Sequence, residues 1–200
     1  MPNGFLSESY IRIDILMLSF FLSDFDVGVY SFAAMFVEGL FQIPVVIRTV
    51  ANPKLVRLLL VGNQRKVIEF CRKISKMSLG IFAIICGCAL VIFPFLEPFF
   101  PNELVRLCYP FLLVLASGLF IFSSTIPFDQ ILLQAGYPGR QSLLMTINLL
   151  VNFSLNLFLI PMFGLYGAAT ATAIAFLFAT ISVNLAAYLW LGYRRGLLLS

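Results

Sequence analysis

The hydrophobic positions of this chain form long unbroken runs rather than the short alternating stripes of a soluble protein. The clearest run lies between Gln141 and Tyr193, where no Asp, Glu, Lys or Arg occurs and only the turn-like string from Pro161 to Gly164 interrupts the pattern. This stretch is long enough for two membrane crossings of about 20 apolar residues each. Because backbone groups in lipid must satisfy their own hydrogen bonds, the pattern predicts two helices joined by a tight hairpin.

Further apolar runs predict the rest of the fold. The first 50 residues are less uniform, because Arg12, Asp14 and Glu38 interrupt them, but we interpret their two runs as membrane spans as well. The predicted fold is all-α, a polytopic bundle of six transmembrane helices that forms a single domain over residues 1–200. The predicted spans are residues 4–23, 27–49, 77–96, 106–127, 141–161 and 165–191.

Basic residues are concentrated between the second and third predicted spans, where only Glu69 opposes them. They are Arg48, Lys54, Arg57, Arg65, Lys66, Arg72, Lys73 and Lys76. The positive-inside rule makes this connection cytoplasmic and, with an even number of spans, places both termini in the cytoplasm. Cys71 lies in the connection and is expected to be accessible there. Beside membrane spans, such a cluster indicates contact with anionic lipid rather than nucleic acid.

Composition agrees with a multi-pass membrane protein. The chain is 61% hydrophobic and 11% charged, whereas a soluble domain averages about 25% charged residues. The four cysteines lack ligand spacing and no histidine is present, so we expect no metal site and no cofactor. The lack of histidine and of a large external loop also argues against an enzyme.

Charged side chains inside the first two predicted spans are the main candidates for a functional site. Counted at about 1.5 Å per residue, Arg12 and Asp14 lie near the bilayer centre, and Glu38 reaches a similar depth. A charge there costs at least about 2.5 to 3.5 kcal/mol, so these residues are expected to face the bundle interior or a water-filled cavity. Glu8, one turn from Arg12, and Gln42 in the second span complete this group.

These residue types match the chemistry of transport. The planar guanidinium of Arg12 suits a phosphate or carboxylate group, and a desolvated Asp14 or Glu38 could change its protonation state. The alternative is a set of charge pairs that only hold the helices together.

Amide side chains add a second polar feature. Asn148, Asn152 and Asn156 recur every four residues and form one stripe, which could either join helices by hydrogen bonds or line the cavity. Gln130 and Gln134 are one turn apart near the cytoplasmic end of the fourth span and could face the same aqueous region. In the sixth span, small residues are expected to let helices approach closely. These are Gly164, Gly167, Ala168, Ala171 and Ala175.

Several short motifs, in a fixed order between about residues 10 and 190, resemble a known family. The motifs are Arg12-Ile13-Asp14, Val27-Gly28-Val29-Tyr30, Pro44, Asn52-Pro53, Leu132-Leu133-Gln134-Ala135-Gly136 and the stretch from Asn152 and Asn156 through Pro161, Gly164 and Gly167 to Thr172. Together they resemble the C-terminal lobe of the Wzx-type O-antigen and capsule exporters, within the multidrug/oligosaccharidyl-lipid/polysaccharide superfamily.

The resemblance implies two six-helix lobes with a cavity that opens to each side of the membrane in turn. It implies flipping of undecaprenyl-diphosphate-linked oligosaccharide across the inner membrane during O-antigen and lipopolysaccharide synthesis. The location it implies is a bacterial or archaeal plasma membrane. Arg12 then matches a cationic position that can meet the diphosphate, and Asp14 matches the acidic position of the first-helix motif. Six spans are half of such a transporter, so a fragment that needs a missing N-terminal lobe or a second copy is expected. Alternatives are a cation-coupled multidrug exporter of the same superfamily and an integral membrane polysaccharide polymerase or ligase.

Overall fold

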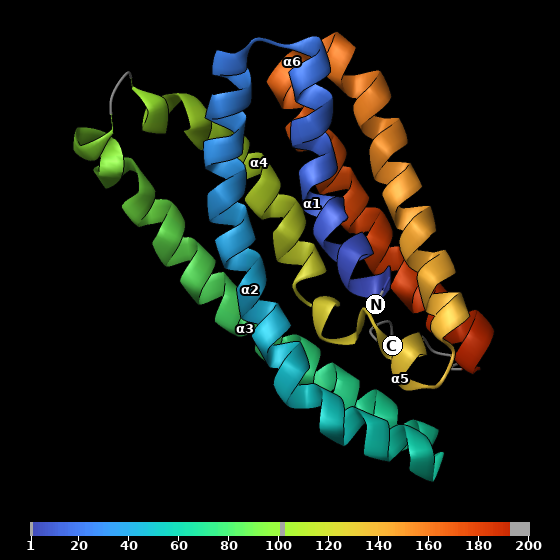
Figure 1. The fold of residues 1–200 in the computed structure, drawn as a ribbon. Coiled ribbons are helices and arrows are strands. Elements are labelled where there is room, and N and C mark those ends of the chain that lie inside the picture. The colour runs from blue at the N-terminus through green and yellow to red at the C-terminus, as the bar shows by residue number, and fades with distance from the viewer. Residues whose placement is uncertain (1, 101–102, 193–200) are drawn as a thin grey trace.

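The structure is a computed structural model that describes the backbone of residues 2–100 and 103–192 and the side chains from Arg12 onward within these ranges. Every regular element in them is a helix, which confirms the predicted all-α fold (Figure 1). The elements are α1 (Pro2–Phe21), α2 (Asp24–Val61), α3 (Gln64–Ile92), η1 (Phe93–Phe99), α4 (Leu104–Phe122), η2 (Ile126–Phe128), α5 (Ile131–Gln134) and α6 (Pro138–Leu191).

The element α6 is a hairpin of two helices, as the charge-free run predicted. The chain reverses at Gly164, whose backbone has φ 57° and ψ −131°, a conformation that strongly favours glycine. The two arms then close tightly, because a Cβ atom on Gly167 would lie 2.0 Å from the carbonyl oxygen of Leu159. The arms comprise Pro138–Phe163 and Leu165–Leu191.

The basic connection between the second and third predicted spans consists of the end of α2 and the start of α3. Helix α2 continues to Val61, and α3 begins at Gln64. Gly62 ends α2 in the left-handed conformation, and the side chain of Asn63 caps α3 by accepting a hydrogen bond from the Lys66 backbone N–H. Figure 1 shows these two helices extending side by side beyond the rest of the bundle.

Helix formation in this segment changes the environment of Cys71. Six of the basic residues are exposed on the outer faces of α2 and α3: Lys54, Arg57, Arg65, Lys66, Lys73 and Lys76. Leu55, Val67 and Cys71 are buried on the inner faces. Cys71 has no exposed surface. The expectation that Cys71 is accessible from the cytoplasm is therefore wrong, because a residue next to charged neighbours can still face the packed side of a helix.

Five helical segments of the described chain are long and apolar enough to cross a membrane, as expected of a multi-pass protein. They are Asp24–Val61, Gln64–Phe99, Leu104–Phe122, Pro138–Phe163 and Leu165–Leu191. Helix α1 has 20 residues, the length that a crossing needs. The crossing by α1, the single-domain organisation and the cytoplasmic location of both termini stay predictions.

The C-terminal arm of α6 buries its small residues inside the bundle. Its small residues Ala168, Ala171 and Ala175 have no exposed surface, and the hairpin packs against α1 and α4 (Figure 1). A Cβ atom on Gly118 of α4 would lie 2.6 Å from the Cα atom of Ala173. The small residues therefore allow close helix packing, as the sequence predicted.

Candidate functional site

A groove of about 340 Å³ between α1 and α2 contains two of the predicted charged residues. It is lined by Arg12, Ile15, Leu16, Ser31, Met35 and Glu38. The Nε atom of Arg12 lies 4.0 Å from the Oε1 atom of Glu38, and their side chains are 72% and 32% exposed. This pair is open to the surroundings rather than enclosed in the bundle.

The depth of this groove makes its exposure significant. Arg12 lies nine residues before Phe21, the last residue of α1, which corresponds to about 14 Å along the helix. With the predicted crossing by α1, Arg12 and Glu38 would lie near the middle of a hydrocarbon layer about 30 Å thick. Charges at this level are unfavourable against lipid, so at that depth this face would need water or another protein surface.

Asp14 lies on the opposite side of α1, inside the bundle. Its side chain is 2% exposed. The hydroxyl groups of Tyr30 in α2 and Thr172 in α6 both donate hydrogen bonds to its Oδ2 atom, the latter at 3.1 Å, and the Ile15 backbone N–H donates to Oδ1 at 3.0 Å. The structure therefore separates Asp14 from Arg12, and the two do not share one surface.

A small void lies beside Asp14. Its volume is about 10 Å³, and it is bordered by Asp14, Thr172 and apolar side chains that include Phe41 and Phe176. This is close to the smallest space that a water molecule needs. The void is too small for an organic substrate.

The amide stripe on the first arm of α6 is divided between two roles. Ser182 on the second arm donates a hydrogen bond to Oδ1 of Asn148 at 2.9 Å, which joins the two arms. Asn152 and Asn156 have no exposed surface, and the Nδ2 atom of Asn156 donates to the Asn152 backbone oxygen at 3.1 Å. Among the described side chains, none donates a hydrogen bond to the buried Oδ1 atom of Asn156.

Asn156 lies at the same level of the bundle as the Asp14 cluster. Asn156 and Thr172 are each eight residues from Gly164, one on each arm of the hairpin, which places both about 12 Å from the turn. Asp14 is seven residues from the neighbouring end of α1. A buried amide oxygen and a buried carboxylate therefore occur within one layer of the lobe.

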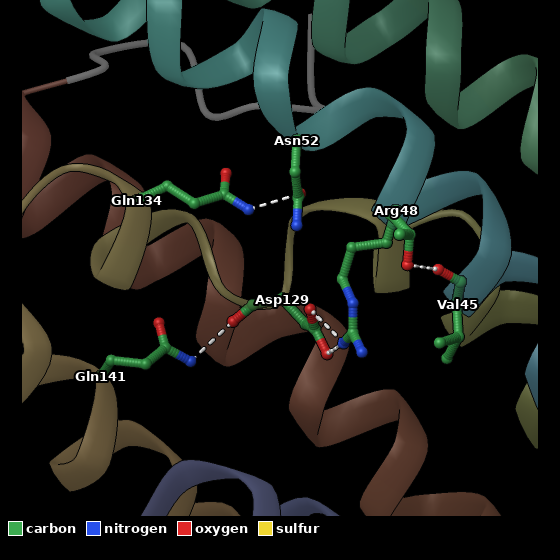
Figure 2. Close-up of polar contacts among 7 residues, drawn as sticks. Val45, Arg48, Asn52, Asp129, Gln134 and Gln141 are labelled. Carbon is green, nitrogen blue, oxygen red and sulfur yellow. Dashed lines mark hydrogen bonds and ion pairs between the residues drawn. The ribbon is translucent and has the colours of Figure 1, made fainter. Parts of the chain in front are cut away.

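A polar network holds the connection between α4 and α6 against α2 (Figure 2). Nη1 of Arg48 lies 2.9 Å from Oδ1 and 2.7 Å from Oδ2 of Asp129, and both side chains are largely buried. Gln134 donates a hydrogen bond to Oδ1 of Asn52, and Gln141 donates to the backbone oxygen of Asp129 at 2.8 Å. Burial raises the pKa of Asp129, while the positive charge of Arg48 acts in the opposite direction.

The predicted site residues thus occupy three places, of which the bundle interior with Asp14 and the amide stripe has been described above. The α1–α2 groove contains Arg12 and Glu38, and Gln42 is exposed one turn further along α2. Gln134 belongs to the network around Asp129, and the neighbouring Gln130 is half-buried. The side chain of Glu8 lies outside the part of the chain whose side chains are described.

Sequence analysis missed the partners of these residues. Ser31 and Met35 line the groove, and their spacing of seven and three residues from Glu38 is a helical signal that could have revealed them. Tyr30 and Thr172 lie in helices far from Asp14 along the chain, and no local pattern connects them with it. Likewise, no local pattern connects Arg48 with Asp129, which are 81 residues apart in the chain.

Comparison with known proteins supports the fold. No protein-family model and no curated protein sequence matches the chain. Among solved structures, it resembles a transporter of the MOP superfamily from Pyrococcus furiosus, in which a reverse polarity of the binding pocket is described as suggesting a different function. The TM-score is 0.76 at 18% identity, over 99% of this chain and 44% of that chain.

A second solved structure with this fold is an outward-facing multidrug resistance MATE family transporter of the MOP superfamily. Its TM-score is 0.72 at 20% identity, again over 99% of this chain and 44% of that chain. The chain therefore has the fold of a part of these transporters and spans less than half of their length. MOP is the multidrug/oligosaccharidyl-lipid/polysaccharide superfamily, so its fold agrees with the predicted resemblance, while the Wzx type within it stays a prediction.

Proposed function

We propose that this chain is one lobe of a membrane transporter and that the α1–α2 groove forms one wall of its substrate cavity. The observation that carries the proposal is the pair of Arg12 and Glu38, which is open to the surroundings in the groove. A membrane crossing by α1 would place this pair at mid-membrane depth. Against lipid, each charge would cost at least about 2.5 to 3.5 kcal/mol. A facing lobe, or a second copy of the chain, would separate the groove from lipid and enclose a water-filled cavity in which these charges stay hydrated.

The proposed substrate is a lipid-linked oligosaccharide with a diphosphate group, such as one carried on undecaprenol, which moves to the outer leaflet by alternating access. Arg12 supports this choice because its guanidinium can form two parallel hydrogen bonds with phosphate oxygens. Its side chain is 72% exposed in the groove, and the nearest carboxylate oxygen of Glu38 is 4.0 Å away. In this role the protein serves the synthesis of cell-surface polysaccharide, including O-antigen and lipopolysaccharide, in a bacterial plasma membrane.

Substitution of Arg12 tests this proposal. Arg12→Ala should weaken binding of a polyprenyl diphosphate to the purified chain by about tenfold or more, because a charge-assisted hydrogen bond contributes about 1.5 to 3 kcal/mol. Arg12→Lys should restore part of the affinity, because lysine keeps the charge and loses the planar fork. Binding is measured by titration in detergent, and flipping by the protection of a fluorescent diphosphate lipid in liposomes.

Arg106 supplies a matched control for Arg12. Its side chain is 75% exposed and lies 3.7 Å from Glu103, at the start of α4 and outside the groove. Arg106→Ala should leave binding unchanged. If Arg12→Ala binds the diphosphate lipid as tightly as the unmodified chain, Arg12 does not contact the substrate and only pairs with Glu38.

A second candidate function is cation-coupled multidrug export, and the buried Asp14 favours it. A carboxylate that receives hydrogen bonds from Tyr30 and Thr172 beside a small void could bind the driving cation. Transport of the organic cation ethidium, driven by a sodium or proton gradient and lost in Asp14→Asn, would support this function. Ethidium should not be transported by the lipid flippase, because Arg12 would repel it.

A further inference from the structure

A second groove, of about 380 Å³ and with an apolar lining, lies next to the polar groove. It is lined by Met35, Phe36, Gly39 and Leu40 of α2, Ala89 and Leu90 of α3, Phe93 of η1 and Leu112 of α4. Met35 also lines the groove that contains Arg12 and Glu38. The two grooves therefore share a wall, and one is charged while the other is apolar.

The helical repeat of α2 explains how one helix borders both grooves. Ser31, Met35 and Glu38 are spaced by four and three residues and lie on one face of α2. Phe36, Gly39 and Leu40 follow on the adjacent face, which is turned toward α3 and α4. The surface thus changes from polar to apolar across a single residue, Met35.

Gly39 keeps the apolar groove open. It follows Glu38 directly in the sequence, and a Cβ atom placed on it would have no other atom within 4 Å. A side chain at this position would therefore project into free space at the junction of the two grooves. The size of the apolar groove is within the range of about 300 to 1,000 Å³ that is usual for sites that bind small molecules.

We infer that the apolar groove holds the hydrocarbon chain of an anionic lipid whose phosphate-bearing head lies at Arg12. This inference rests on the proposed function, which places the phosphate group in the polar groove. A soluble phosphate compound would leave the apolar groove empty, because it has no apolar part. A neutral hydrocarbon would fill the apolar groove but would make no charged contact with Arg12. A lipid with one long chain and a phosphate head matches both grooves and their shared wall.

Photolabelling tests the inference directly. The probe is geranylgeranyl diphosphate with a diazirine group at the far end of its chain, used with the full chain in nanodiscs. Labelled peptides should contain residues of the apolar groove, such as Leu90 and Phe93. A geranylgeraniol probe with the same diazirine, which lacks the phosphates, should label these positions much less.

Gly39→Leu fills the apolar groove and should remove most of the labelling at Leu90 and Phe93. The substitution is favourable for the helix itself, since leucine has a higher helix propensity than glycine. Gly80→Leu is the matched control, because a Cβ atom there also has no other atom within 4 Å. Gly80 lies nine residues from Ala89, or about 14 Å along α3, and its substitution should leave labelling unchanged.

The outcomes separate this inference from the proposed function. If Arg12→Ala weakens diphosphate binding while Gly39→Leu leaves labelling of the groove intact, the chain site is refuted and the head site remains. If a phosphatidylcholine with a diazirine on its acyl chain labels the groove equally well and without dependence on Arg12, the groove holds ordinary membrane lipid and the inference is overturned. Loss of labelling in both Arg12→Ala and Gly39→Leu, with Gly80→Leu unaffected, supports the inference.

Discussion

Replacing Arg48 by alanine should destabilise the bundle strongly, because it leaves the Asp129 carboxylate in a largely buried position without its charged partner. The Arg48 and Asp129 side chains are only 16% and 15% exposed, and their closest atoms are 2.7 Å apart. Removal of one partner from a buried pair costs about 3 to 5 kcal/mol. Since some hydration remains at this site, we expect a loss of about 2 to 4 kcal/mol in the free energy of unfolding.

A double-mutant cycle isolates the contribution of the pair. Arg48→Ala, Asp129→Ala and the double variant are unfolded reversibly in detergent micelles, and the coupling energy is expected to be about 1 to 3 kcal/mol. The control pair is Arg65 and Glu69 in α3, which lie 3.0 Å apart with side chains 89% and 60% exposed. That pair should show a coupling energy below about 0.5 kcal/mol.

The pH dependence gives an independent check on the same pair. Burial raises the pKa of Asp129, so the folded protein binds this proton more tightly than the unfolded chain, and the contribution of Asp129 to stability falls as pH rises above its ordinary pKa. Without the positive charge of Arg48, the pKa of Asp129 in the folded protein rises further. The loss in free energy of unfolding caused by Arg48→Ala should therefore be larger at pH 8 than at pH 5. An equal deficit at both pH values, or a coupling energy no larger than that of the control pair, would refute this reasoning.

Three further predictions concern packing, topology and assembly. Gly167→Ala should lower the free energy of unfolding by about 1 to 3 kcal/mol or more, because its Cβ atom would lie 2.0 Å from the Leu159 carbonyl oxygen. The control is Gly80→Ala, and equal stabilities of the two variants would contradict the tight hairpin. In a variant without native cysteines, Leu60→Cys should react with a membrane-impermeant thiol reagent from the cytoplasmic side, because Leu60 is 82% exposed beside the turn between α2 and α3; reaction from the outside would invert the predicted topology. A monomer of this chain should not transport lipid-linked sugar; transport should require a homodimer or a separate N-terminal lobe. The oligomeric state is measured by sizing in detergent and transport by a flipping assay in liposomes, where an active monomer would show that one lobe suffices.

The sequence alone determined the helical class of this protein and the position of its last hairpin. The run from Gln141 to Tyr193 has no charged residue, and a chain buried in lipid must form helices to satisfy its backbone. Gly164 could be identified as part of the turn because it ends a turn-like string that begins at Pro161, and glycine and proline both favour turns. In the basic segment the sequence pattern did not predict the environment of Cys71. A charge cluster shows that a segment is exposed, but it does not show whether the segment is a loop or the outer face of a helix.

Only the tertiary structure decided which polar residues meet. Two residues apart on a helix, Arg12 and Asp14 must point to nearly opposite sides of α1. The packing of α1 against α2 and α6 determined that Asp14 faces inward, to Tyr30 and Thr172, while Arg12 stays exposed. Arg48 and Asp129 are 81 residues apart in the chain and meet where the connection after α4 folds back on α2. Local sequence determines which residues share one face of a helix, whereas the partner of that face depends on packing between helices that are distant along the chain.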